Sequence, residues 1–280
     1  MNLALVPLDG SELSDSILGH LERLLGHDPW ELHLLRVLPT PAAGADPSVV
    51  ARERSVAELH LASVRQRLEA RGARVATELR EGDPAGEILA AAEERRPALV
   101  AMSSHGRTGV LRWVRGSVAE RVLRNCATPL LLATPRAGGA APELRYRRIL
   151  VPLDGSEGSA SVLPWVEALA RAHQAEVVLL RVEWEGLNRP LLAAALAPER
   201  VLESLGPWVE RLAAHGSKVR ALAAQGDHAR EILEVAEREE VDLVAMATHA
   251  RTGLSRFVDG SVSEKVLRHC TRPLLVAPRG

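Results

Sequence analysis

Short apolar runs alternate with longer amphipathic segments along the whole chain. In the N-terminal half, residues 73–80 alternate between apolar and polar side chains, and four other segments form nearly continuous apolar runs, at 3–8, 31–38, 98–103 and 129–134. Runs of this length are typical of strands that are buried on both faces, whereas alternation is typical of a strand near an edge. The pattern therefore predicts five strands in this half of the chain.

Capping residues mark where helices should begin and end between these strands. Ser11 suits the N-cap of a helix that runs to about Leu25, and Gly26 fits its C-terminal stop. A long helix is predicted over 46–71, with apolar positions at helical spacing at Val56, Leu59, Val64 and Leu68. Two shorter helices are predicted at 85–96 and 116–126. Strands that alternate with helices through short connections imply a doubly wound α/β sheet with parallel strands.

The second half of the chain repeats the first. Residues 100–134 and 244–278 agree at 21 of 35 positions when they are aligned without a gap. LALVPLDGS at 3–11 likewise corresponds to RILVPLDGS at 148–156. The two pairs of segments are offset by 144 and 145 residues. Solenoid repeats have periods of only about 20–50 residues, so this offset indicates that a whole domain was duplicated. We predict the two domains and the linker between them at 1–135, 146–280 and 136–145.

Composition excludes some classes of function. The chain is 46% hydrophobic and 25% charged, and its net charge of −1 argues against a general binder of nucleic acid or membrane surfaces. No apolar run approaches the roughly 18 residues that span a bilayer, and the chain starts with a strand-like segment instead of a signal pattern. We expect a soluble cytoplasmic protein. Cys126 and Cys270, at equivalent positions of the two copies, are predicted to be small buried hydrophobes.

The predicted sheet places polar residues where ligands bind in such folds. In an open parallel sheet, ligands bind beyond the carboxyl ends of the strands, where the strand order reverses. Asp9 lies at the carboxyl end of the first strand, and the loop 103–115 lies at the carboxyl end of the fourth. If the strand order is 3-2-1-4-5, these two strands are neighbours at the reversal. Asp9 and the loop then face one crevice.

The loop after the fourth strand has features of a phosphate site. It ends in Gly116-Ser117 at the start of a helix, where free backbone N–H groups and the helix dipole favour an anion. Arg107 and Arg112 add the capacity for charge-assisted hydrogen bonds. Gly-Ser is also a common loop end and helix cap, but its coincidence with the strand reversal favours phosphate. Asp9 begins an Asp-Gly-Ser turn sequence, so its residues alone leave a capping role and a ligand role open.

Several motifs of enzymes and metal proteins are absent from the sequence. There is no GxxxxGK[ST] phosphate loop, and no GxGxxG follows the first strand. No Cys/His set has zinc spacing, and there is no GxSxG elbow. We therefore predict no catalytic residue and no metal ligand.

The combined motifs resemble the universal stress protein family. They are VPLDGSE, the GDP turn, and AMSSHGRTGVLRWVRGSVAERVL followed by PLLLA, and both halves of the chain resemble the family over nearly their whole length. The resemblance implies Rossmann-like (HUP-type) five-stranded sheets of order 3-2-1-4-5. It also implies that the two domains pair as an intramolecular pseudo-dimer through 129–134 and 273–278. One branch of the family binds ATP through a loop of the form G-x2-G-x9-G-[ST].

The family's nucleotide site can be carried over residue by residue. The first copy reads Ser103-x2-Gly106-x9-Gly116-Ser117, so Ser103 replaces the first glycine. The resemblance implies that Asp9 contacts the adenosine part of the ligand. In the first domain the implied nucleotide-binding residues are Pro7, Asp9, Val37, Met102, Ser103, Gly106, Gly116, Ser117 and Val118. In the second domain they are Pro152, Asp154, Val182, Met246, Gly260, Ser261 and Val262.

The second copy departs from the loop pattern at both early glycines. It reads Ala247-x2-Ala250-x9-Gly260-Ser261. If the second glycine position needs a positive φ, a Cβ there costs roughly 1 kcal/mol or more, enough to weaken binding about tenfold. If φ is negative, the methyl group of Ala250 only crowds a phosphate. We predict that the first site binds ATP more tightly and that the second is weaker or empty.

The leading functional hypothesis is an ATP-binding stress-response protein that senses or signals through nucleotide occupancy. Mg²⁺ is expected to accompany the phosphates, although no carboxylate cage for it is readable, and hydrolysis is expected to be slow or absent. The expected partners are the nucleotide, the other domain and further copies of the chain, with no nucleic acid and no membrane. Two alternatives stay open, a protein-interaction module that binds no nucleotide and an adenine-nucleotide hydrolase.

Overall fold

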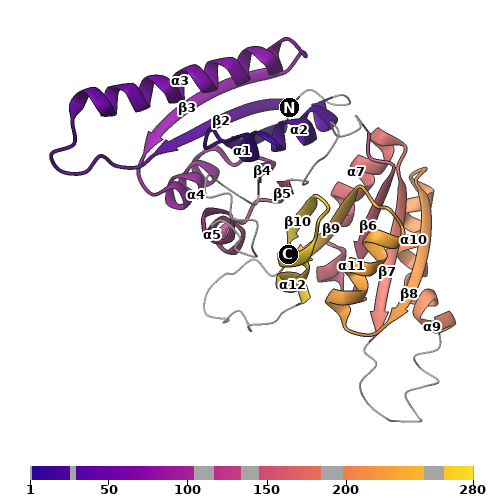
Figure 1. The fold of residues 1–280 in the computed structure, drawn as a ribbon. Coiled ribbons are helices and arrows are strands. Elements are labelled where there is room, and N and C mark those ends of the chain that lie inside the picture. Colours follow the sequence, from indigo (N-terminus) through magenta and orange to yellow (C-terminus); the bar gives the residue numbers. More distant parts are fainter. Residues whose placement is uncertain are drawn as a thin grey trace. The chain divides into compact units, whose positions relative to one another are not determined.

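Each half of the chain forms a compact α/β unit. The computed structural model describes residues 2–25, 30–103, 117–133, 145–183, 198–248 and 262–279. The chain divides into two units, Met1–Pro142 and Glu143–Gly280. In each unit helices cover a parallel sheet (Figure 1). Residues 136–144 of the predicted linker lie outside the described residues.

The first unit has the predicted strand order. Its described elements are β1 (Asn2–Pro7), α1 (Glu12–Asp15), α2 (Ile17–Leu25), β2 (Trp30–Leu38), α3 (Pro47–Glu69), β3 (Arg74–Glu81), α4 (Pro84–Arg95), β4 (Leu99–Ser103), α5 (Ser117–Asn125) and β5 (Leu130–Ala133). The strands lie in the order β3-β2-β1-β4-β5, and all of their pairings are parallel. This arrangement confirms the predicted order 3-2-1-4-5.

The second unit repeats this order. Its described elements are β6 (Arg148–Pro152), α6 (Glu157–Ala160), α7 (Leu163–His173), β7 (Glu176–Glu183), α9 (Pro198–Glu203), α10 (Gly206–Ala214), β8 (Lys218–Gln225), α11 (His228–Arg238), β9 (Leu243–Thr248), α12 (Val262–His269) and β10 (Leu274–Pro278). The strands lie in the order β8-β7-β6-β9-β10, again with parallel pairings.

Burial follows the hydrophobic pattern of the strands. Leu5, Val6 and Val100, in the central strands β1 and β4, have no exposed surface, as expected for strands that are covered on both faces. In the edge strand β3 no residue is fully buried. Among the described helices none is long and apolar enough to cross a membrane.

The two cysteines are free and buried, as predicted. Both Cys126 and Cys270 are 5% exposed. Burial raises the pKa of the Cys126 thiol, and it raises the pKa of the Cys270 thiol to about 11. Both thiols therefore stay protonated at neutral pH and pack as small apolar groups.

The helix that was predicted to run unbroken from Ser11 to about Leu25 is divided at Ser16. The backbone N–H of Ser16 bonds the carbonyl of Leu13, three residues back, and the Ser16 hydroxyl donates to the same carbonyl at 2.7 Å. A serine hydroxyl that competes for a backbone carbonyl tightens the turn and interrupts the helix.

The predicted apolar positions of α3 are only half correct. Val64 and Leu68 are buried, but Val56 is 57% exposed and Leu59 is 71% exposed. The buried positions are Ala57, Leu61, Val64 and Leu68, so Ala57 and Leu61 take the places that were predicted for Val56 and Leu59. The small side chain of Ala57 concealed this stripe in the sequence, while the larger Val56 and Leu59 suggested a neighbouring one.

The turn after the first strand of each unit requires glycine. Gly10 has φ +75° and Gly155 has φ +81°, in the left-handed region that side chains disfavour. An added Cβ would lie 2.3 Å from Nη1 of Arg36 at Gly10, and 2.2 Å from Nη1 of Arg181 at Gly155. In each unit an arginine from the second strand thus packs against this turn.

We expect Leu68→Ala to lower the free energy of unfolding of the first unit by about 2–5 kcal/mol, because it leaves a cavity in the core. Leu59→Ala, on the exposed face of the same helix, should change this free energy by less than about 0.5 kcal/mol. Urea unfolding followed by circular dichroism measures both variants. Equal losses would show that the α3 face is assigned wrongly.

We expect Gly155→Ala to destabilise the second unit by at least about 1 kcal/mol, because a Cβ is strained at positive φ and Arg181 must also move. The matched control is Gly206→Ala in α10, where an added Cβ meets no heavy atom within 4 Å. There alanine should leave stability unchanged or raise it, since alanine favours helix. Thermal unfolding compares the two variants. An undiminished melting temperature in Gly155→Ala would contradict the requirement for glycine at this turn.

Candidate functional site

The strand order reverses between β1 and β4 in the first unit. β1 and β4 pair in parallel, with Ala4 opposite Leu99 and Leu5 opposite Val100, so their carboxyl ends lie at the same edge of the sheet. These ends are Pro7 and Ser103. β1 continues outward to β2 and β3 on one side, and β4 continues to β5 on the other. The predicted position of the reversal is thereby confirmed, and ligands bind at such a point in this class of sheet.

The Asp9 carboxylate is fixed at this edge by Ser11. Oδ1 of Asp9 accepts hydrogen bonds from the backbone N–H of Ser11 at 2.9 Å and from its hydroxyl at 2.6 Å. The Ser11 oxygen in turn accepts from the N–H of Ser14 at 3.0 Å, which caps α1. The cap is therefore Ser11, as predicted. Asp9 orients that cap and does not form it.

A second serine closes the turn from the other side. The hydroxyl oxygen of Ser14 accepts from the backbone N–H of Asp9 at 3.0 Å. Ser14 is only 5% exposed. The turn is thus a closed set of hydrogen bonds that begins and ends within Asp9–Ser14. It determines both the direction of the carboxylate and the start of the helix.

The second unit repeats this turn. Oδ1 of Asp154 accepts from the N–H of Ser156 at 2.9 Å and from its hydroxyl at 2.5 Å. The Ser156 oxygen accepts from the N–H of Ser159 at 3.1 Å and caps α6. The hydroxyl of Ser159 accepts from the N–H of Asp154 at 3.3 Å.

The second carboxylate also has an arginine partner. Nη2 of Arg279 lies 2.6 Å from Oδ2 of Asp154. Partial burial acts to raise the pKa of Asp154, but hydrogen bonds from Ser156 and Arg279 outweigh it and hold the pKa well below its usual range. The carboxylate is therefore ionised at neutral pH, with serine donors on one oxygen and a guanidinium on the other.

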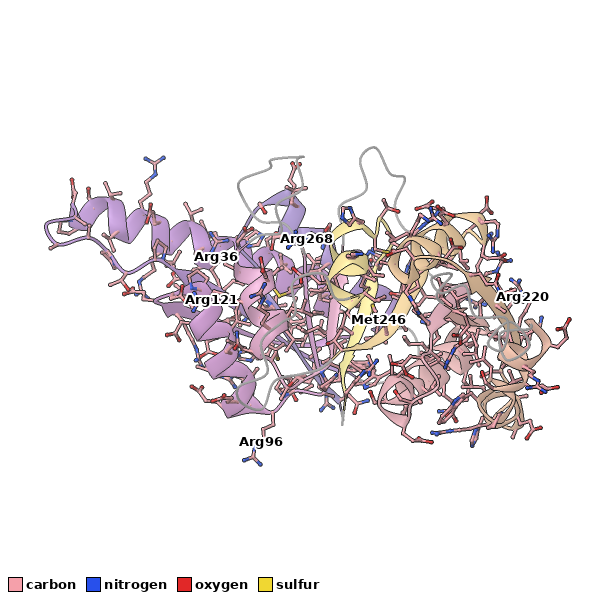
Figure 2. The ribbon with its side chains drawn as sticks, turned by 90° about the horizontal axis from the view of Figure 1, so that it is seen from below. Arg36, Arg96, Arg121, Arg220, Met246 and Arg268 are labelled. Carbon is pink, nitrogen blue, oxygen red and sulfur yellow. The ribbon has the colours of Figure 1, made fainter. Side chains whose placement is uncertain are left out.

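The predicted apolar residues lie at the same carboxyl edge, with different exposure. Val37 is next to last in β2 and is partly exposed, whereas Val182 of β7 is 6% exposed. Met102 and Met246 are 6% and 4% exposed, so their side chains belong mainly to the core. Met246 is labelled in Figure 2. Among these four residues, only Val37 is not buried.

The remaining predicted residues fall at strand ends, at helix starts or outside the description. Pro7 and Pro152 are the last residues of β1 and β6. Ser117 is the first residue of α5, and Val118 follows it. Val262 is the first residue of α12 and is 37% exposed. Four predicted residues lie outside the described part of the chain, namely Gly106, Gly116, Gly260 and Ser261.

Two kinds of residue were not among the predicted site residues, namely serines with a local sequence signal and an arginine without one. Ser14 and Ser159 were readable, because the pattern Asp-Gly-Ser-x-x-Ser occurs in both copies. Arg279 carried no such signal. It lies 125 residues from its partner Asp154, and only the fold brings the two together.

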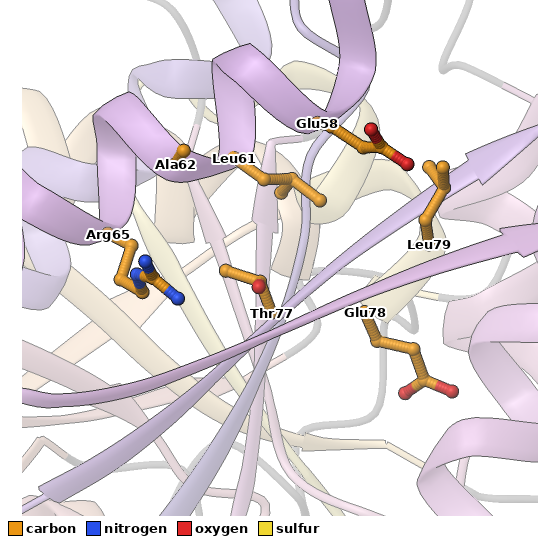
Figure 3. A pocket seen from close by; sticks show the side chains of 7 residues that line it. All are labelled: Glu58, Leu61, Ala62, Arg65, Thr77, Glu78 and Leu79. Carbon is orange, nitrogen blue, oxygen red and sulfur yellow. The ribbon is translucent and has the colours of Figure 1, made fainter. Parts of the chain in front are cut away.

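A separate recess lies in the first unit between α3 and β3 (Figure 3). It has a volume of about 230 Å³, and its lining residues are Glu58, Leu61, Ala62, Arg65, Thr77, Glu78 and Leu79. None of these is a predicted nucleotide-binding residue. Within the described ranges no group of three or more His, Cys, Asp or Glu residues is arranged to hold a metal ion.

Known proteins resemble this chain in each half and over its whole length. The universal stress protein MJ0531 of Methanocaldococcus jannaschii is 31% identical over 147 residues, which are 48% of this chain and 83% of that protein. The universal stress protein Rv2623 of Mycobacterium tuberculosis is 29% identical over 219 residues, 71% of this chain and 70% of that protein.

A solved structure supports the fold. The crystal structure of a universal stress protein from Archaeoglobus fulgidus matches with a TM-score of 0.79 and 24% identity, covering 100% of this chain and 97% of that one. The model of the universal stress protein family matches residues 2–134 and, separately, residues 145–278. The chain therefore belongs to the universal stress protein family and carries two copies of its domain in tandem.

Proposed function

We propose that this chain binds ATP at the strand reversal of its first domain and acts in the cytoplasmic stress response through nucleotide occupancy. The observation that carries the proposal is the Asp9 carboxylate, which Ser11 fixes at the carboxyl edge between β1 and β4. A carboxylate that is oriented before the ligand arrives loses little conformational entropy on binding.

The described residues suit the adenosine part of ATP. A ribose presents hydroxyl donors, and a carboxylate has about four acceptor positions, so the two serine donors do not by themselves saturate Asp9. Val37 offers partly exposed apolar surface at the end of β2, which suits the flat face of an adenine.

The phosphates are assigned to the Gly116-Ser117 pair of the sequence pattern, of which Ser117 is the first residue of α5, because a helix N-terminus favours anions. We include Mg²⁺ in the proposal as the ion that accompanies the phosphates, with its ligands drawn from the phosphates and water. We propose slow or absent hydrolysis, and pairing of the two domains, on the family resemblance.

We attribute the expected difference in ATP affinity between the two domains to one position of the loop. Ser103 and Ala247 replace the first glycine of the loop pattern and lie in β4 and β9, and neither is among the described residues with positive φ. A side chain at this position is therefore unstrained in both copies. The predicted difference in affinity then rests on the second glycine position, Gly106 against Ala250.

We expect Gly116→Val to abolish most of the tight ATP binding, because a branched side chain at the helix start blocks the approach of a phosphate to the backbone. Gly260→Val should change the tight binding little, since the second site contributes less to it. Isothermal titration calorimetry with ATP and Mg²⁺ on the full chain gives the affinity and the stoichiometry of each variant.

Gly206→Val serves as the control for the substitution itself, because Gly206 lies in α10, outside the predicted loops. Equal losses of affinity in Gly116→Val and Gly260→Val would contradict the unequal sites. An unaltered chain that binds no ATP would contradict the proposed function and favour the interaction module.

A further inference from the structure

The backbone around Arg279 is anchored at the carboxyl edge of the second sheet. The N–H of Arg279 donates to the carbonyl of Thr248, the last residue of β9, at 2.7 Å. The carbonyl of the preceding residue, Pro278, accepts from the hydroxyl of Ser161 at 3.0 Å. The chain that leaves β10 is thus held both to β9 and to the turn between α6 and α7.

The side chain of Arg279 fits into space that Gly158 provides. A Cβ added at Gly158 would lie 3.3 Å from Cδ of Arg279, closer than ordinary van der Waals contact. The corresponding residue of the first copy is Leu13, so this space is not a general feature of the domain. Glycine in α6 lets the aliphatic part of the arginine lie against the helix.

The guanidinium is committed to Asp154. Nη2 of Arg279 donates to Oδ2 at 2.6 Å, and its side chain is 23% exposed. Nε of Arg279 is buried and has no acceptor within the part of the chain that the structure describes. Asp154 is therefore the acceptor that fixes this cation at the edge, and Ser156 occupies the other carboxylate oxygen.

We propose that Arg279 closes the Asp154 carboxylate to a ribose and thereby lowers the nucleotide affinity of the second domain. The inference rests on the proposed function, in which this carboxylate receives the ribose hydroxyls. A ribose hydroxyl would have to displace the guanidinium from Oδ2 of Asp154 or share that oxygen with it. Charge-assisted hydrogen bonds are about twice as strong as neutral ones, so a neutral hydroxyl competes poorly for Oδ2.

The test measures the second site alone, in the full chain with Gly116→Val in the first domain. We expect Arg279→Met to bind ATP more tightly than this background by up to about fivefold, the worth of an ion pair on a half-exposed carboxylate, because the competing cation is gone while the aliphatic stem remains. Titration calorimetry with ATP and Mg²⁺ gives the affinity. The pKa of Asp154, followed by carboxyl carbon NMR, should rise in the same variant.

Gly158→Leu is a second, independent way to separate the Arg279 guanidinium from Asp154. Its side chain takes the space of the arginine stem and should also increase ATP affinity, although Arg279 is retained. The matched control is Arg220→Met, at a residue that is labelled in Figure 2. This variant removes contacts with Glu176 and Glu239. Glu176 begins β7, so these contacts lie at the amino edge of the same sheet, and ATP binding should not change.

The outcomes separate this inference from the proposed function. Unchanged ATP affinity in Arg279→Met would overturn the inference alone, and so would an unaltered chain that binds two ATP molecules equally. Weaker binding would also overturn it, by making Arg279 a ligand contact. If neither the unaltered chain nor any variant binds ATP, the proposed function fails and the inference falls with it.

Discussion

The proposed site depends on the turn that follows the first strand of each unit. Its glycine has a positive φ, and the turn joins the carboxyl end of the strand to the start of the next helix, with the aspartate just before the glycine. One serine hydroxyl then performs two tasks. It donates to the carboxylate and accepts from the first turn of the helix, as Ser11 does for Asp9 and Ser14. The orientation of the carboxylate and the start of the helix are therefore a single structural unit, and a change in one disturbs the other.

Arginine packing reinforces this turn. Arg36 of β2 and Arg181 of β7 lie so close to Gly10 and Gly155 that no side chain fits there without displacing the guanidinium. The side chain of Arg36 is 4% exposed, so its charge is held in the interior beside the turn. In each unit the second strand, β2 or β7, therefore packs an arginine against the turn that carries the aspartate.

Much of the fold was predictable from the sequence, because buried parallel strands appear as continuous apolar runs and their carboxyl ends share one edge. The position of Asp9 at the reversal follows from that rule alone. Features that depend on one side chain were harder to predict. The buried stripe of α3 includes Ala57, which hydropathy underrates, and the break at Ser16 coincides with a hydroxyl that bonds the carbonyl of Leu13. The pairing of Arg279 with Asp154 depends on tertiary structure, since no local pattern links residues so far apart in the chain.

The duplication separates what the scaffold requires from what a ligand requires. The Asp-Gly-Ser-x-x-Ser turn is the same in both copies, because the start of the helix needs it whether or not a nucleotide binds. Residues that affect only a ligand are free to change, and the proposed difference in affinity assigns Ala250, which stands where the first copy has Gly106, to this group. Asp154 therefore does not by itself indicate a working site, because its hydrogen bonds with Ser156 give it a structural reason to stay. The second domain keeps its carboxylate, and under the proposed function the competition between a ribose and Arg279 for Oδ2 of Asp154 sets the nucleotide affinity of this domain.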